Sequence, residues 1–225
     1  MQEVKYRGIV LYVNDYGEYD KRLVILTKEA GKITAFAHGA RRPNSQMASA
    51  ANSFVMGEFD LYQSGTAYSL KSANIENYFF ELSQDMEKTC YAAYFCELAS
   101  YFCVEGSPAG EFLNLLYAAQ KLLAGSRIDF KLIRAVYEEK IVVLDGEGIN
   151  SDTLLRLPEY RSFMPLEETV KYAFDYVLEA PLSKVFAFRL NDRYMQTFLK
   201  LTAAYLKNNI DHPMKSLPIL EAMYP

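Results

Sequence analysis

The chain has 225 residues, of which 51% are hydrophobic and 23% are charged, so it can bury a core and does not have the composition of a disordered protein. Its net charge of −4 at pH 7 argues against a protein that coats nucleic acids through overall positive charge. The three cysteines, the N-terminus without a secretory leader and the lack of any apolar run near the about 20 residues of a membrane span predict a reduced, cytoplasmic protein with no membrane partner.

The first 80 residues contain short strand-like segments separated by turns that carry glycine. In the third segment Ile33, Ala35 and Ala37 alternate with more polar or larger side chains, which is typical of a strand with one buried face. Short strands at this spacing predict a small β-barrel or sandwich. The longer break at residues 39–52 has room for a short helix. The predicted strands are residues 6–13, 22–28, 32–37, 53–62 and 67–73.

From about Leu82 onward the pattern changes to a helical one, because Tyr91, Phe95 and Leu98 recur at helical spacing. The sequence therefore predicts an α+β protein with a barrel domain at residues 1–80 and an all-helical domain at residues 81–225. Residues 146–165 have no clear period and are predicted to be an irregular insertion. The first predicted helix starts near Ser83, and the others are 107–125, 130–144, 166–178, 193–208 and 213–223. Pro165 is predicted to start the helix that continues through 166–178, because proline is favoured at the first helical position.

No arrangement of residues indicates catalysis, so the sequence favours a binding protein over an enzyme. Cys90, Cys96 and Cys103 have none of the close spacings of zinc ligand pairs and are expected in the core. His38 and His212 lie far apart in the sequence and belong to no triad. We therefore predict no catalytic residue, no metal site and no cofactor. The enzyme alternative, a nuclease on a β-barrel, needs a carboxylate cluster that the sequence does not display.

Charge is distributed unevenly along the chain. Residues 1–80 hold nine Lys or Arg against eight Asp or Glu, whereas the remainder is acidic by five charges. The adjacent glutamates Glu138-Glu139 and Glu167-Glu168 are expected on solvated helix faces. A site for an extended polyanion is therefore predicted in the barrel rather than in the helices.

The strongest basic feature is the pair Arg41-Arg42, because guanidinium groups match phosphate oxygens and also stack on bases. The small residues Gly39 and Ala40 before it allow a ligand close to the backbone. A pair of arginines that only solvates a loop is the alternative, and His38 is equally compatible with a base contact and with an ordinary surface position. The predicted set consists of Lys21, Arg22, Lys32, Arg41 and Arg42 on phosphates and Phe36 and His38 on bases, with Tyr62 and Tyr68 as further stacking faces.

A second hypothesis makes the helical part a peptide-recognition adaptor, with the barrel as its scaffold. Lys131, Arg134 and Lys140 are spaced along one predicted helix beside Ile133 and Ile141. Such a groove is suited to a carboxylate and an apolar side chain. The alternative is an ordinary amphipathic helix with solvated cations, and the sequence alone leaves both possibilities open.

Several longer motifs stand out along the chain. They are GEYDKRLVILT at 17–27, GKITAFAHGARRP at 31–43, GEFDLY at 57–62, TCYAAY at 89–94 followed by Glu97-Leu98, and MKSL at 214–217. These motifs resemble those of the bacterial RecO recombination mediators. The resemblance is specific in the N-terminal half, whereas residues 145–213 are similar to the family only in their helical pattern.

The resemblance implies an OB-fold followed by a helical domain, in a nucleoid-associated protein of recombinational DNA repair. It implies binding of single- and double-stranded DNA, annealing of complementary strands and no catalytic residue. The implied partners are RecR, the acidic C-terminal tail of single-strand-binding protein and, indirectly, RecA. Many RecO proteins carry a four-cysteine zinc module after the third helix, but residues 136–165 contain no cysteine, so this chain is expected to lack that zinc.

Overall fold

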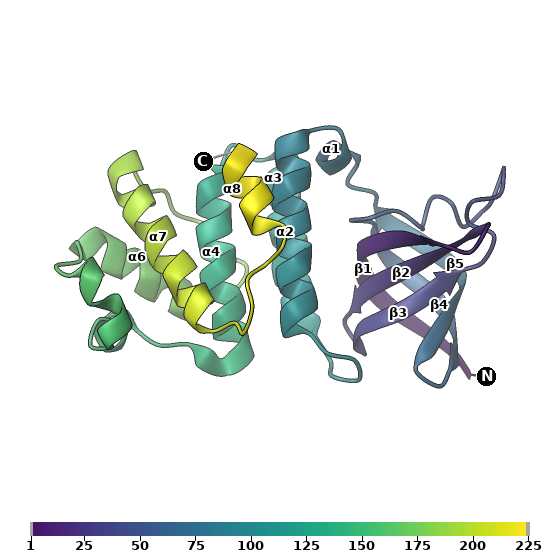
Figure 1. Cartoon of the computed structure of the whole chain (residues 1–225), viewed down its shortest axis with the longest axis horizontal. Coiled ribbons are helices and arrows are strands. Elements are labelled where there is room, and N and C mark those ends of the chain that lie inside the picture. The colour runs from purple at the N-terminus through teal and green to yellow at the C-terminus, as the bar shows by residue number, and fades with distance from the viewer. Residues whose placement is uncertain (1, 224–225) are drawn as a thin grey trace. The chain divides into compact units, whose positions relative to one another are not determined.

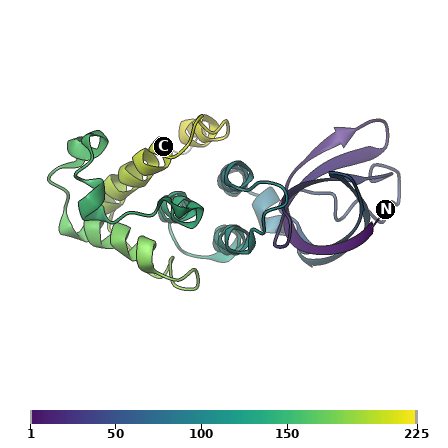
Figure 2. The same ribbon diagram turned by 90° about the horizontal axis from the view of Figure 1, so that it is seen from below.

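The computed structural model describes residues 2–223, and its N-terminal part is a closed five-stranded barrel (Figure 1). The strand order around the barrel is β1-β2-β3-β5-β4, with β3 and β5 parallel and the other pairs antiparallel. Figure 2 shows the strands curving round into a ring. This is an OB-like fold, and the predicted α+β class is confirmed. The strands are β1 Gln2–Tyr16, β2 Asp20–Thr27, β3 Gly31–Ala37, β4 Met56–Ser64 and β5 Ala67–Asn77.

The alternation predicted for the third strand is present. Ile33, Ala35 and Ala37 point into the barrel core, whereas Lys32 and Phe36 are half-buried on the outer face. Strand β2 differs because all residues from Leu23 to Thr27 are buried. Helical elements contact β1 and β2 from outside, so this part of the barrel wall has two covered faces.

Strand β1 is longer than predicted because it serves two partners. Its first half pairs with β4 and its second half with β2, and both registers meet at Gly8 and Ile9. The short helix considered for residues 39–52 is not formed. That segment consists of successive turns, and it returns to the barrel where the Phe54 N–H donates to the Val10 carbonyl at 2.8 Å.

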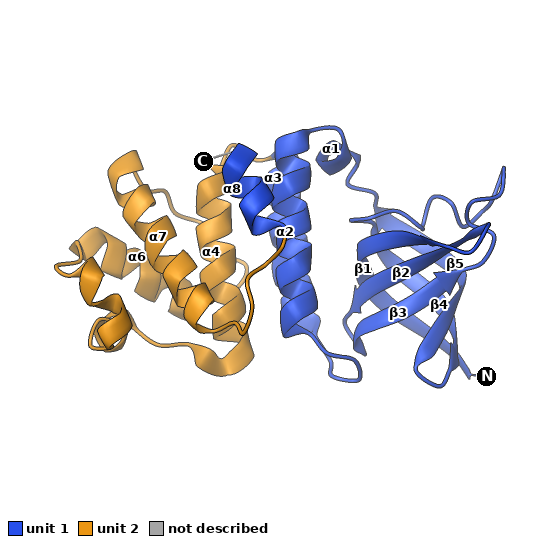
Figure 3. Ribbon diagram, in the orientation of Figure 1, with its two compact units in different colours: residues 1–125, 216–225 blue, residues 126–215 orange. Residues whose placement is uncertain are grey.

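The chain divides into two compact units, residues 1–125 with 216–225, and residues 126–215 (Figure 3). The first unit therefore contains the barrel together with the helices that follow it and the last helix. Its helices are α1 Phe80–Ser83, α2 Met86–Phe102, α3 Gly110–Gly125 and α8 Leu217–Met223. The second unit contains α4 Phe130–Val142, the π-turn Val143–Glu147, α5 Ser151–Leu154, the 3₁₀ turn Pro158–Phe163, α6 Glu168–Glu179 and α7 Asp192–Asn208.

Within the first unit, the turn between β2 and β3 is bonded to the connection between α2 and α3. Gly31 forms an isolated bridge with Glu105, and the Gly106 N–H donates to the Ala30 carbonyl at 2.9 Å. Cys96 and Cys103 are buried in the same helical layer, as predicted for core residues, whereas Cys90 is only half-buried. The bonds between the β2–β3 turn and the α2–α3 connection explain why these helices belong to the same unit as the barrel.

Helix α8 returns to the first unit through the MKSL motif. The Glu97 carboxylate on α2 accepts hydrogen bonds from the Ser216 N–H at 2.8 Å and from the Ser216 hydroxyl. The helix begins at Leu217 rather than near Pro213 as predicted. Among residues 2–223 no helix combines the length and apolar character needed to cross a membrane.

Helix α4 is the central element of the second unit, and it is buried on every side from Leu132 to Val142. The prediction that Glu138-Glu139 lies on a solvated face is therefore wrong, because both side chains are fully buried. The Glu138 carboxylate accepts from Arg134 Nε at 2.7 Å. Neither Glu139 oxygen has a hydrogen-bond partner within the described part of the chain.

The predicted irregular insertion at 146–165 contains two short helical turns, α5 and the 3₁₀ turn Pro158–Phe163. The Ser151 N–H and hydroxyl both donate to the Asp175 carboxylate at 2.7 Å, which fastens α5 to α6. The placement of Pro165 as the first residue of a helix is wrong. Helix α6 begins at Glu168, after the N-cap Glu167, whose backbone is extended.

Candidate nucleic-acid interface

The basic sequence after β3 forms a tight turn at one end of the barrel. Gly39 has a φ of 67°, a conformation that glycine adopts without a steric cost, and its carbonyl accepts from the Arg42 N–H at 3.0 Å. Ala40, in the middle of the turn, is buried in the barrel core, whereas His38 before it and Arg41 after it are exposed. Arg41 and Arg42 follow directly and are both exposed.

The Asp20 carboxylate lies under this turn. One of its oxygens accepts from the Gly39 N–H at 2.7 Å, and the other lies 2.7 Å from Nδ1 of His38. The hydrogen bond from Gly39, then that from His38, lowers the pKa of Asp20. The carboxylate is thus held ionised while it fastens the first two residues of the turn.

Aromatic side chains surround the turn. The rings of Tyr16 and Phe36 are 4.9 Å apart between centroids, and His38 stacks on Phe36 with an interplanar angle of 18°. The guanidinium of Arg42 lies 5.2 Å from the centroid of the Tyr19 ring. Tyr16 and Tyr19 are not among the predicted residues, although their positions on both sides of Gly17, between the predicted strands 6–13 and 22–28, were a usable signal.

Arg22 and Arg41 lie at the same end of the barrel as the basic turn. Arg22 is exposed on β2 and pairs in register with Phe36 on β3. The Arg41 N–H donates to the Tyr19 carbonyl at 2.9 Å, and its guanidinium pairs with Asp15 at 3.3 Å. The structure therefore gathers five of the predicted residues, namely Arg22, Phe36, His38, Arg41 and Arg42.

The other predicted cations of the barrel are bonded to the backbone elsewhere. Lys21 donates to the Ala51 carbonyl at 2.9 Å, which fastens the end of the 38–55 segment. Lys32 donates to the Ser100 carbonyl near the end of α2. Both ammonium groups hold the first unit together, and neither joins the cluster around the basic turn.

The two tyrosines predicted as further stacking faces differ from each other. Tyr68 is only 3% exposed, and burial raises its pKa to about 12, so its assignment as a stacking face is wrong. Its ring packs edge-on against Tyr6 inside the barrel wall. Tyr62 remains half-buried on the outside, with the Lys71 ammonium 5.3 Å from its ring centroid.

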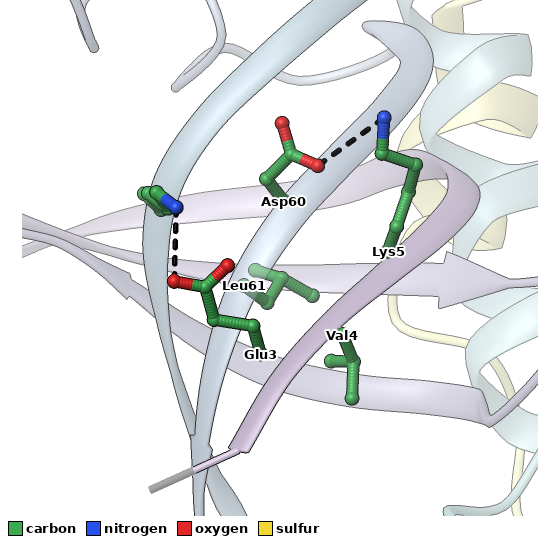
Figure 4. Close-up of a pocket in the computed structure, with 6 residues that line it drawn as sticks. Glu3, Val4, Lys5, Asp60 and Leu61 are labelled. Atoms are coloured by element: carbon green, nitrogen blue, oxygen red, sulfur yellow. Dashed lines mark hydrogen bonds and ion pairs between the residues drawn. The ribbon is translucent and has the colours of Figure 1, made fainter.

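A pocket of about 200 Å³ lies elsewhere on the barrel, and the charges that line it are of both signs (Figure 4). Lys5 pairs with Asp60 at 3.4 Å, and Lys71 pairs with Glu3 at 2.9 Å. Because each cation there has an acidic partner, this surface is less suited to a polyanion than the basic turn is. It provides a matched reference for experiments on the basic turn.

The cations predicted to hold a peptide carboxylate lie on α4. Arg134 is buried against Glu138, and Lys140 is buried with its ammonium donating to the carbonyls of Val177, Leu178 and Ala180 at 2.9–3.1 Å. Lys131 is half-buried near the start of the helix. Two of the three cations therefore bond inside the second unit and do not line a shared surface groove. In residues 2–223 no group of three or more His, Cys, Asp or Glu is arranged to hold a metal ion.

Residues 1–79 match the family model for the N-terminal part of recombination protein O. DNA repair protein RecO of Alkaliphilus metalliredigens is 33% identical over 143 residues, which is 64% of this chain and 58% of that protein. RecO of Shouchella clausii is 34% identical over 63% of the chain and 55% of the relative. These two matches span little more than half of the relatives. RecO of Acetivibrio thermocellus aligns with 99% of the chain and 98% of its own length, at 24% identity.

Proposed function

The chain belongs to the RecO family of DNA repair proteins, and on that premise we propose that it binds and anneals single-stranded DNA as a recombination mediator. A role in recombinational DNA repair follows from the family. The proposal for this chain is that residues 1–80 act as the DNA-binding domain and that the chain needs no catalytic residue.

The observation that supports this proposal is the gathering of exposed arginines and aromatic rings at one end of the barrel. Arg22, Arg41 and Arg42 are exposed there beside Tyr16, Tyr19 and Phe36. Arginine forks neutralise phosphates, and aromatic faces stack on unpaired bases without a sequence preference. OB-folds bind oligonucleotides on the face of strands 2 and 3 and on adjoining loops such as the one between strands 1 and 2. Arg22 and Phe36 lie on β2 and β3, and Tyr16 and Tyr19 flank the turn between β1 and β2, whereas the basic turn belongs to the connection between β3 and β4. Unpaired strands therefore suit this surface better than a closed duplex, whose bases are already stacked.

Removal of the arginine pair tests the location of the site. We expect Arg41→Ala/Arg42→Ala to weaken binding of a labelled single-stranded oligonucleotide, measured by fluorescence anisotropy across a salt series. The log–log salt slope should become shallower by about 1.4, because each phosphate contact contributes about 0.7. The matched control is Lys5→Ala/Lys71→Ala, which removes the same charge from the pocket elsewhere on the barrel. Equal slopes in the parent and the arginine variant would place the DNA elsewhere.

The same two variants test annealing. A surface that neutralises phosphates and leaves the pairing edges of bases accessible lowers the repulsion between two strands. The parent should therefore accelerate duplex formation between complementary oligonucleotides without ATP, and the arginine variant should do so much less. A parent protein that anneals only with ATP would contradict the proposed mechanism.

We further propose that the partners of the family, RecR and the acidic tail of single-strand-binding protein, also bind this chain, and that it thereby helps RecA to load. The support for these partners is family membership. The burial of Arg134 and Lys140 does not support the α4 groove as the tail site. Co-elution with RecR in size-exclusion chromatography and calorimetry with an acidic, Phe-ending peptide are the tests, and absence of both interactions would refute this part.

A further inference from the structure

An acidic side chain stands at the centre of the surface to which we assign DNA. Asp20 is the first residue of β2, and 28% of its side chain is exposed. A negative charge there repels phosphates, so its presence calls for a physical reason. Its two hydrogen bonds, to the Gly39 N–H and to His38, supply that reason, because they fix both the backbone and a ring of the basic turn.

We propose that Asp20 is a positioning residue for DNA binding, which holds the basic turn in its binding conformation at an electrostatic cost. This inference rests on the proposed function. Gly39 is the pivot, since its N–H is held by Asp20 and its carbonyl holds the Arg42 N–H. The other Asp20 oxygen directs Nδ1 of His38 toward β2, so that the ring lies on Phe36 and its Nε2 edge faces away from the carboxylate.

Preorganisation is the physical advantage of this arrangement. A turn that is already ordered does not lose conformational entropy when DNA binds, whereas a mobile turn loses about 0.5–1.5 kcal/mol for each immobilised side chain, which is about two- to tenfold in affinity. Without Asp20, the Gly39 N–H loses its carboxylate acceptor, and His38 keeps only its stacking on Phe36. The turn then keeps the bonds of Arg41 to the carbonyls of Tyr19 and Glu18, together with the burial of Ala40.

Asp15 provides a matched comparison, because it has the same charge at the same end of the barrel but a different bonding role. It pairs with the Arg41 guanidinium at 3.3 Å and its side chain is 60% exposed. Asp15 takes part in the β1–β2 ladder, but no hydrogen bond described for residues 2–223 joins a backbone N–H to its carboxylate. Replacement of Asp15 therefore changes the charge next to Arg41 and leaves the backbone of the turn in place.

The experiment measures the Kd of a labelled single-stranded oligonucleotide for the full chain and four variants. Charge alone predicts that Asp15→Asn, Asp20→Asn and Asp20→Ala all bind about twofold tighter than the parent, because each removes one negative charge near the phosphates. Positioning predicts that Asp20→Asn, which keeps an oxygen for the Gly39 N–H, binds at least as tightly as the parent. It predicts that Asp20→Ala binds about three- to tenfold more weakly than Asp20→Asn, although their charges are equal.

Asp20→Glu is the fourth variant and keeps the test decisive if Asp20→Ala does not fold. Its charge is that of the parent, but the carboxylate is displaced by one methylene, so positioning predicts weaker binding and charge alone predicts no change. Equal affinities of Asp20→Ala and Asp20→Asn, or an Asp20→Glu protein that binds like the parent, would overturn the inference. These outcomes differ from failure of the proposed function, in which the parent itself binds no DNA or Arg41→Ala/Arg42→Ala binds as well as the parent.

Discussion

Gly31→Ala is expected to destabilise the first unit by about 3 kcal/mol or more, which is in the range of strongly disruptive substitutions. Gly31 has a φ of 65°, and a Cβ added to it would lie 2.1 Å from the Val104 carbonyl oxygen and 2.6 Å from that of Ser107. Both obstacles are backbone atoms of the connection between α2 and α3. They cannot move aside without separating that connection from the barrel.

Gly17→Ala is the matched control, because Gly17 has a similar φ of 59° but no atom within 4 Å of the position that a Cβ would take. Alanine there costs only the left-handed backbone, about 1–2 kcal/mol. Urea unfolding of both variants, followed by circular dichroism, separates the backbone term from the steric one. If the two variants lose the same stability, the close docking of Gly31 on the helices is not a major contribution to the fold.

Glu139→Met is expected to stabilise the second unit at neutral pH by about 1–3 kcal/mol, the cost of an unsatisfied buried polar group. Burial raises the pKa of Glu139 well above its ordinary 4.5, and Asp175 raises it further while Lys140 opposes the shift. Between 4.5 and the raised pKa, the folded protein retains a proton that the unfolded chain releases. The stability of the parent should therefore fall as pH rises through this interval.

Thermal unfolding of the parent and Glu139→Met across a pH series from about 4 to 8 measures this effect. The variant should lose the part of the pH dependence that Glu139 causes, and its advantage over the parent should grow with pH. Glu179→Met, which changes an exposed glutamate on α6, controls for the loss of one negative charge. A parent and a Glu139→Met variant with parallel stability curves would show that the carboxyl is solvated in the folded protein.

Patterns that depend on near neighbours in the chain were readable from the sequence. The alternation of Ile33, Ala35 and Ala37 gave the inner face of β3, and the spacing of Tyr91, Phe95 and Leu98 gave α2, because strand and helix periods are local properties of the backbone. The Arg41-Arg42 pair after a glycine identified the basic turn for the same reason. The family motifs extended this reading to an OB-fold followed by helices.

The roles of individual charged side chains were decided only by the tertiary structure. Lys32 caps α2 and Lys140 caps α6, although each reads in the sequence as an available surface cation. Asp20 reads as one more acidic residue, yet it holds the basic turn from eighteen positions away. Glu139 looks solvated but is buried. Whether a charged group meets water, a carbonyl or a ligand depends on which distant segments pack around it, and no local period carries that information.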